Sequence, residues 1–192
     1  MTVAELVRKS RSIRRFVESE RISEQTLREL VDLARLSPTG GNKQPLKFLL
    51  VSEPGECAKM FPLVAWAGAL TDWPGPAEGE RPAAYLAILL DKGVSEGAGV
   101  NHGIAAQSIA LGACEKGIGC CMMGAIQRPK IKSAFDIPDQ YDVLLVLALG
   151  KPAEKVLLDP LGLDGDTDYW RDEQSVHHVP KRSLDEVIVR FG

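Results

Sequence analysis

Residues 101–117, NHGIAAQSIALGACEKG, decide how the fold of this 192-residue chain is interpreted. Between Ile104 and Ala113 only Gln107 and Ser108 are polar, so a helix here would be apolar on nearly every side. Such a helix belongs in the middle of a protein or of an assembly. Its small residues would let a second helix or a sheet approach closely.

Two continuous apolar runs flank this segment in the sequence, AAYLAILL at 83–90 and VLLVLAL at 143–149. Runs of this length are typical of strands buried on both faces, although a short run alone does not exclude a helix. We therefore expect a sheet and smaller helices arranged around one central helix.

Composition limits the class of protein. A chain of 192 residues is expected to form one domain with its own core. The net charge of −3 argues against a general nucleic-acid binder. No apolar run reaches transmembrane length and residues 1–10 hold no signal core, so we expect a cytoplasmic protein that is not in a membrane. The four cysteines lack C-x-x-C spacing and are expected to be reduced, partly buried thiols; they are Cys57, Cys114, Cys120 and Cys121.

The segment RKSRSIRRF at 8–16 concentrates positive charge in a slightly acidic protein, with five basic residues in eight positions. One interpretation is a solvated basic patch, as most charge clusters are. The other is a phosphate site, because arginine forms forked, charge-assisted hydrogen bonds and serine adds a hydroxyl. The residues alone leave both open.

A second candidate is the turn SPTGGNKQP at 37–45, which follows a helix that Ser23 is expected to cap. Pro38 would end that helix, and the glycine pair permits positive φ and a close approach of the backbone to a ligand. The turn also precedes an expected strand at 46–52.

Residues 61–82 place Trp66 and Trp73 among prolines and glycines. A loop of this length is either a binding loop or a surface excursion with its aromatic rings against the core. The adjacent His177 and His178 do not form a metal-binding pattern, because neighbouring residues of a strand point to opposite faces and no third ligand has suitable spacing. We predict no metal site.

The order and spacing of several motifs resemble the nitroreductase family of FMN-dependent oxidoreductases. They are RSIRRF at 11–16, SPTGGNKQP at 37–45, GIAAQ at 103–107, the segment 119–126 and VPKR at 179–182. Each motif is weak alone, but the ordered set covers nearly the whole chain.

The resemblance implies a set of cofactor residues. The FMN phosphate would be held by the basic cluster with help from the C-terminal region, the turn would reach the flavin from a partner subunit, and backbone groups near 122–124 would face the ring. The implied residues are Arg11, Ser12, Arg14, Arg15, Pro38, Thr39, Gly40, Asn42, Met122, Met123, Gly124, Lys181 and Arg182. Many members have an arginine where this chain has Ser10, and an acidic residue before the glycine that here follows Met123.

The resemblance also implies a fold and an activity. The expected fold is an α+β sandwich, a central and mostly antiparallel sheet flanked by helices, in a homodimer. Residues 1–192 would form a single FMN-binding domain whose C-terminal extension, from about 153, lies on the partner subunit. The expected enzyme passes electrons from NADH or NADPH through FMN to a nitroaromatic, a quinone or a similar small acceptor by a ping-pong mechanism. Trp66 and Trp73 would contact that acceptor.

No side chain is expected to act as a catalytic acid, base or nucleophile, because the flavin performs the chemistry. Related flavin reactions, such as reductive dehalogenation or fragmentation of the flavin, stay open, as does a flavin-binding module without turnover.

Overall fold

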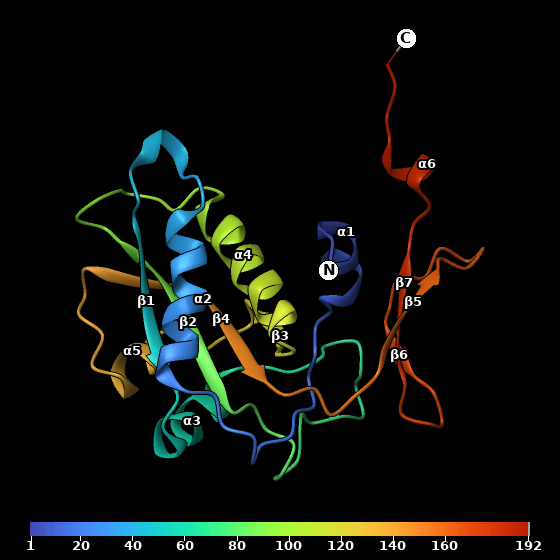
Figure 1. The fold of residues 1–192 in the computed structure, drawn as a ribbon, viewed down its shortest axis with the longest axis horizontal. Coiled ribbons are helices and arrows are strands. Elements are labelled where there is room, and N and C mark those ends of the chain that lie inside the picture. Colours follow the sequence, from blue (N-terminus) through green and yellow to red (C-terminus); the bar gives the residue numbers. More distant parts are fainter. Residues whose placement is uncertain (192) are drawn as a thin grey trace. The chain divides into compact units, whose positions relative to one another are not determined.

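The computed structural model describes residues 1–191 and divides into two compact units. The first unit comprises Met1–Trp66 and Gly75–Ala153. The second comprises Ala67–Pro74 and the chain from Glu154 onward. Figure 1 labels the helices and strands of both.

A four-stranded antiparallel sheet forms the centre of the first unit, in the order β1-β2-β4-β3. Its strands are β1 (Leu46–Val51), β2 (Ala84–Asp91), β4 (Tyr141–Gly150) and β3 (Gly119–Met123). In the register, Leu86 of β2 lies opposite Leu50 on one side and Leu147 on the other. The antiparallel sheet and the strand assignment of both apolar runs are therefore confirmed.

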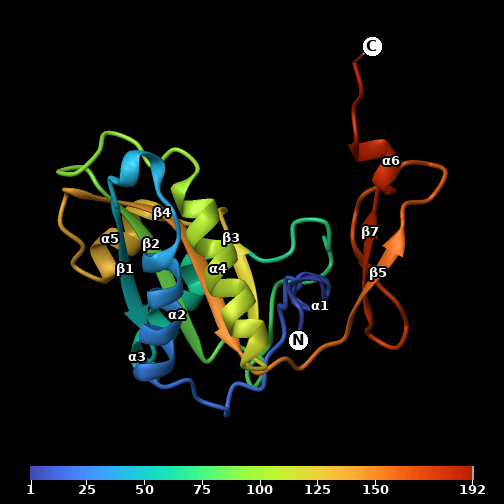
Figure 2. The same cartoon turned by 45° about the horizontal axis from the view of Figure 1, so that its top comes forward.

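The two faces of β2 are both covered, which explains why its sequence is continuously apolar. Leu86 and Ile88 pack into one buried cluster with α2 (Glu24–Leu36) and α4 (Asn101–Glu115). Successive residues of a strand point to opposite faces, so Tyr85 lies on the other face and is also fully buried. Figures 1 and 2 show α2 and α4 side by side over the first face.

Small residues on α4 set the distance between these two helices. A Cβ atom added at Gly112 would come within 2.2 Å of Leu33 Cδ1 on α2, so a larger residue there would require the Leu33 side chain to move. Ser23 caps α2 by accepting a hydrogen bond from the backbone N–H of Thr26. Both observations confirm what the sequence predicts for the central helix and for the start of α2.

Shorter elements complete the first unit. They are the helices α1 (Val3–Lys9), α3 (Pro54–Met60) and α5 (Arg128–Ala134), and the 3-10 turns η1 (Gly40–Asn42) and η2 (Phe61–Leu63). Helix α3 is not evident from the sequence, because it begins with a Pro-Gly pair that is more typical of a turn.

The second unit contains a three-stranded sheet in the order β5-β7-β6 and one short helix. Strand β5 (Val156–Pro160) pairs in parallel with β7 (His177–Lys181), and β6 (Trp170–Arg171) pairs antiparallel with it. Helix α6 (Leu184–Val187) follows. Between β5 and β6, residues 161–169 form neither helix nor strand.

Candidate functional site

The basic segment lies along the β3 edge of the sheet. The backbone N–H of Ile13 donates to the carbonyl of Cys120 at 3.0 Å, and Ser12 forms a parallel bridge with Cys120. A Cβ at Gly119 would come within 2.9 Å of Ile13 Cβ, so the missing side chain permits this close approach. The structure thus places the segment beside the strand that carries Met122 and Met123.

All three predicted arginines of this segment have guanidinium groups engaged within the chain. Arg11 donates to the carbonyls of Val7 (2.6 Å) and Ser10 (2.7 Å), at the C-terminal end of α1. Arg15 forms a two-pronged ion pair with Glu80, whose Nε–Oε2 distance is 2.9 Å. The Glu80 carboxylate neutralises the charge of Arg15, whereas the carbonyls around Arg11 leave its positive charge in place.

Ser12 and Arg14 occupy the other side of the segment. Alternate residues of an extended chain point in opposite directions, and here Ile13 is buried whereas Ser12 is exposed. Arg14 is half-buried, and its Nη1 lies 3.4 Å from the carbonyl oxygen of Ser12. A hydroxyl and a guanidinium therefore share one side of the segment, the arrangement that suits an anion.

A small pocket adjoins the same segment, between the end of α1, α4 and β3. Its volume is about 220 Å³, and its lining includes Lys9, Ser10 and Arg11 over the backbone of residues 117–119. The rest of its lining is mostly apolar, with Ile13, Ala110 and Ile118 among the residues, and within residues 1–191 it includes no carboxylate. Its volume is below the roughly 300–1,000 Å³ of pockets for drug-sized ligands.

The predicted flavin-contacting residues at the end of β3 are alternately exposed and buried. Met122 is exposed and Met123 is buried, while Gly124 just beyond the strand is exposed. The backbone at this end of β3 is thus accessible next to a flexible thioether side chain.

The turn at 37–44 is conformationally strained. Gly41, Asn42 and Gln44 have φ values of 57°, 53° and 51°, in the left-handed region that side-chain-bearing residues seldom adopt. For Asn42 and Gln44, which carry side chains, this conformation costs about 1–3 kcal/mol each and persists where the surrounding structure holds it. Within the turn, Thr39 Oγ1 accepts from the N–H of Gln44 at 3.2 Å, and Asn42 Oδ1 accepts from its side-chain amide at 3.3 Å.

The turn is also attached to α4. The N–H of Gly40 donates to Oδ1 of Asn101 at 3.0 Å, and the hydroxyls of Ser37 and Ser108 lie 2.7 Å apart. Pro38 and Asn42 are exposed. Asn101 did not stand out in the sequence except as the start of the central helix, because its partner lies 61 positions away.

The basic segment contacts α4 further along, where Ser10 Oγ donates to the carbonyl of Ala110 at 3.5 Å. Helix α4 has 15 residues, which corresponds to a length of roughly 20 Å. Within one chain, the turn therefore contacts α4 at Asn101 and Ser108, and the basic segment contacts it at Ala110, about half a turn around the helix from both.

The structure places the two tryptophans in different units. Trp66, in the first, has its ring centroid 6.0 Å from that of Phe61, and a Cβ at Gly75 would come within 2.7 Å of its ring. Trp73, in the second, lies beneath the guanidinium of Arg171 at 4.2 Å.

The remaining predicted residues, Lys181 and Arg182, are exposed in the second unit, where Arg182 lies 3.6 Å from Glu186. Nearby, His177 is buried against Tyr169, with ring centroids 5.1 Å apart. His178 lies between Asp159 (2.6 Å) and Asp172 (3.2 Å).

The cysteines are not placed for nucleophilic chemistry. All four are buried thiols. Burial raises the pKa of the Cys57, Cys114 and Cys120 thiols above the ordinary range, which keeps them protonated at neutral pH. Within residues 1–191, no three or more His, Cys, Asp or Glu side chains are grouped so that they could hold a metal ion, and no helix is long and apolar enough to cross a membrane.

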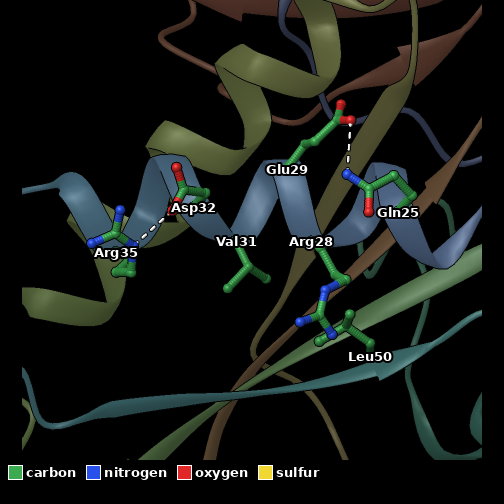
Figure 3. A pocket seen from close by; sticks show the side chains of 7 residues that line it. All are labelled: Gln25, Arg28, Glu29, Val31, Asp32, Arg35 and Leu50. Carbon is green, nitrogen blue, oxygen red and sulfur yellow. Dashed lines mark hydrogen bonds and ion pairs between the residues drawn. The ribbon is translucent and has the colours of Figure 1, made fainter.

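Two further pockets lie between α2 and the outer edge of β1. Figure 3 shows one of about 580 Å³, in which Arg28, Val31 and Leu50 lie between the helix and the strand. The other, of about 360 Å³, shares Val31, Arg35 and Leu50 and is also lined by Thr39 and Gln44 of the turn. This groove is not predictable from the sequence, because it is lined by separate segments of the chain.

Comparison with known proteins places this geometry in a family. YodC of Bacillus subtilis (strain 168), named as a candidate NAD(P)H nitroreductase, is 24% identical over 170 residues, which are 73% of this chain and 84% of that protein. A nitroreductase family protein from Streptococcus pneumoniae TIGR4 is similar in structure with a TM-score of 0.71, at 18% identity, over 99% of this chain and 100% of that one.

A candidate nitroreductase from Exiguobacterium sibiricum 255-15, solved in complex with FMN, has a TM-score of 0.67 at 19% identity, over 80% of this chain and 90% of that one. These likenesses confirm the α+β fold that the sequence predicts. The model of the nitroreductase family matches residues 7–151, well over half of the sequence. The chain therefore belongs to the nitroreductase family.

Proposed function

We propose that this protein is an FMN-dependent oxidoreductase that passes electrons from NADH or NADPH to a small acceptor such as a nitroaromatic or a quinone. The observation that carries the proposal is the basic segment lying along β3. It sets Ser12 and Arg14 beside the strand whose exposed end is Met122–Gly124. The FMN-bound relative and the name of YodC support the cofactor and the electron donor.

The residues present fit a phosphate group. Ser12 and Arg14 share one side of the segment, and Lys9, Ser10 and Arg11 line a small pocket beside it that has no lining carboxylate. The departure at Ser10 replaces an arginine of many relatives with a hydroxyl whose proton is directed at the Ala110 carbonyl. Arg15 is paired with Glu80, so we assign the phosphate mainly to Ser12 and Arg14, with Arg11 beside them.

The separation of the turn from the basic segment supports a homodimer. In one chain they contact opposite sides of α4, the turn at Asn101 and Ser108 and the basic segment at Ala110. If two copies pack with their α4 helices antiparallel, the turn of one copy comes to the basic segment of the other. Pro38, Thr39, Gly40 and Asn42 would then contact a flavin whose phosphate is held by the partner.

The C-terminal region supports the same assembly. In residues 184–191 five large apolar side chains are exposed, a costly arrangement in an isolated chain; they are Leu184, Val187, Ile188, Val189 and Phe191. The outer edge of β1 pairs with no other strand of the described sheet, and an apolar groove runs beside it. We propose that the extension from about 153 lies on the partner subunit and brings Lys181 and Arg182 to the phosphate.

When bound, FMN accepts a hydride from a nicotinamide and passes electrons to the acceptor, which is chemistry that needs no protein nucleophile. The chain's own task is to hold the donor carbon in a reactive position and to exclude water. Backbone N–H groups near Met122–Gly124 would stabilise negative charge on the reduced ring. The raised pKa of the buried thiols is consistent with a site in which no cysteine reacts.

Residues 61–82 are proposed to screen acceptors, with Trp66 and Trp73 in that role. Each ring is already packed within its own unit, so any contact with the acceptor would use the remaining ring surface. Trp66→Ala and Trp73→Ala should change the kinetic constants for the acceptor more than the affinity for FMN. Equal acceptor constants in both variants would assign these rings to packing alone.

The proposed function is tested by spectroscopy of the purified protein. We expect an oxidised flavin spectrum, release of FMN rather than FAD on denaturation, and rapid bleaching by NADH or NADPH under nitrogen. A quinone or nitroaromatic should restore the colour. A protein that binds FMN but is not bleached by either nicotinamide would be a flavin-binding module instead of an enzyme.

A further inference from the structure

The turn at 37–44 is held to the central helix at two points, and both involve side chains that the sequence did not single out. Asn101 Oδ1 accepts from the N–H of Gly40 at 3.0 Å, and Ser108 Oγ lies 2.7 Å from Ser37 Oγ. Asn101 is 8% exposed, so this hydrogen bond is largely shielded from water.

Asn101 does not serve its own helix in the usual way. It is the first residue of α4, whose N-cap residue, Val100, makes no side-chain capping bond. The asparagine side chain instead accepts a hydrogen bond from the backbone N–H of Gly40. Its role therefore lies outside α4, in the position of the turn.

Part of the turn has an unfavourable conformation. Asn42 and Gln44 carry side chains at positive φ, and such conformations persist only where neighbouring structure fixes them. Bonds within the turn, such as those that Thr39 and Asn42 accept from Gln44, contribute to this. The contacts of Gly40 and Ser37 add a direct link from the turn to α4.

We propose that Asn101 is a positioning residue: its bond to the N–H of Gly40, assisted by Ser108, holds the strained turn in the form that receives FMN. This rests on the proposed function, because it deepens the role of the turn in the same site. The residue touches no reacting atom. It acts through Gly40, by reducing the conformational cost of binding, since a ligand binds more tightly to a site that is already ordered.

The first arm of the test removes the hydrogen-bond acceptor, Asn101 Oδ1, and then restores an acceptor oxygen at the same position. Asn101→Ala should weaken FMN binding by about 10-fold, the effect of losing one buried hydrogen bond of about 1.4 kcal/mol. Asn101→Asp keeps an acceptor oxygen, and the first turn of α4 has no acidic residue, so the carboxylate is favoured there by the helix dipole. It should bind FMN within about 3-fold of the wild type.

The second arm removes the hydrogen-bond donor, the backbone N–H of Gly40. Gly40→Pro deletes the N–H at the first position of a 3-10 turn, where proline is tolerated, and Thr39 before it is already extended (φ −127°, ψ 150°). Gly40→Ala keeps the N–H and adds a carbon 3.9 Å from Asn101 Oδ1, an ordinary contact, so only a loss beyond that of Gly40→Ala is assigned to the missing N–H. The double variant Asn101→Ala/Gly40→Pro should be no worse than Gly40→Pro alone. This arm decides the matter if Asn101→Ala does not fold.

A matched control breaks a different contact of α4. Glu29→Ala removes the ion pair with Lys116 (2.7 Å), which joins α2 to the end of α4 far from the turn. It should change FMN affinity by less than about 2-fold, because exposed pairs contribute little.

Amide hydrogen exchange of the FMN-free protein separates this inference from the proposed function. The Gly40 amide should be protected in the wild type and in Asn101→Asp, and unprotected in Asn101→Ala. If the wild type takes up no FMN while Gly40 is protected, the proposed function is wrong and the hold on the turn stands. If the wild type binds FMN and Asn101→Ala binds equally well, or Asn101→Asp is as weak as Asn101→Ala, the positioning role is overturned.

Discussion

The two units of this protein are stabilised by different forces. Strand β2 of the first unit has eight consecutive buried residues, whereas in the three strands of the second unit only His177 is buried. The second unit relies on polar contacts, among them Arg171–Glu154 at 2.8 Å and His178 between two aspartates. Apolar burial depends little on pH or salt, so the comparison predicts a robust first unit and a second unit that responds to solution conditions.

The largest effect is expected in the core of the first unit. Leu86→Ala should reduce the free energy of unfolding by about 3–4 kcal/mol, because the side chain is fully buried between the sheet and the helices. Urea denaturation followed by circular dichroism measures it. Leu49→Ala, in the half-buried position of β1, is the control and should cost clearly less. Equal losses at the two positions would mean that burial does not distinguish them.

A smaller effect, confined to the second unit, is expected from its buried ion pair. Arg171→Met takes the guanidinium both from the Trp73 ring and from the carboxylate of Glu154, whose side chain is only 1% exposed. We expect a loss of about 2–3 kcal/mol, because the buried Glu154 side chain loses its ion pair with Arg171.

Hydrogen exchange resolved by segment is the measurement for Arg171→Met, with increased exchange in residues 154–181 and unchanged exchange in β2. Arg28→Ala, which breaks an exposed pair with Glu24, is the matched control and should cost about 0.3–0.5 kcal/mol. Increased exchange in β2 would show that the units do not respond separately.

The smallest of the three effects is a pH dependence of the second unit. Hydrogen bonds to Asp159 first and then to Asp172 raise the pKa of His178 above its ordinary value of 6.5. Because the raised pKa belongs to the folded form, the stabilisation is fully present below pH 6.5 and is lost as the pH rises through the higher value. Exchange in residues 156–181 should therefore report lower stability at pH 8.5 than at pH 6.

His178→Phe keeps an aromatic ring to stack on Trp170, where the present ring centroids are 4.2 Å apart, and removes the titrating group. Its exchange, corrected for the intrinsic pH dependence of the chemistry, should no longer vary between those two pH values. A variant that keeps the full pH dependence would locate its cause elsewhere in the unit.

The same contrast explains which parts of the structure the sequence reveals. The apolar runs at 83–90 and 143–149 predict buried strands because side-chain hydrophobicity alone decides their environment. The pairing of Arg15 with Glu80 is not predictable, because it depends on two residues 65 positions apart. Charge density in residues 8–15 leaves a solvated patch and an anion site both open, and only the structure shows that Arg11 bonds to backbone carbonyls and that Arg15 pairs with Glu80.

The turn at 37–44 was partly predictable for a related reason. Its glycine pair indicates positive φ, and Gly41 has it, but Asn42 and Gln44 share that conformation without a sequence signal as strong. Their conformation depends on the turn's internal bonds and on Asn101, which lies on a helix far along the chain. Strain imposed by tertiary contacts is invisible to local patterns.

If FMN is held by its phosphate at the basic segment beside β3, Arg14→Glu should abolish its retention. The measurement is the amount of FMN per chain that stays with the protein after gel filtration, for the wild type and the variant purified in parallel. The wild type should retain close to one FMN per chain and Arg14→Glu essentially none, because a carboxylate there repels the phosphate. A folded Arg14→Glu protein that retains as much FMN as the wild type would contradict the account.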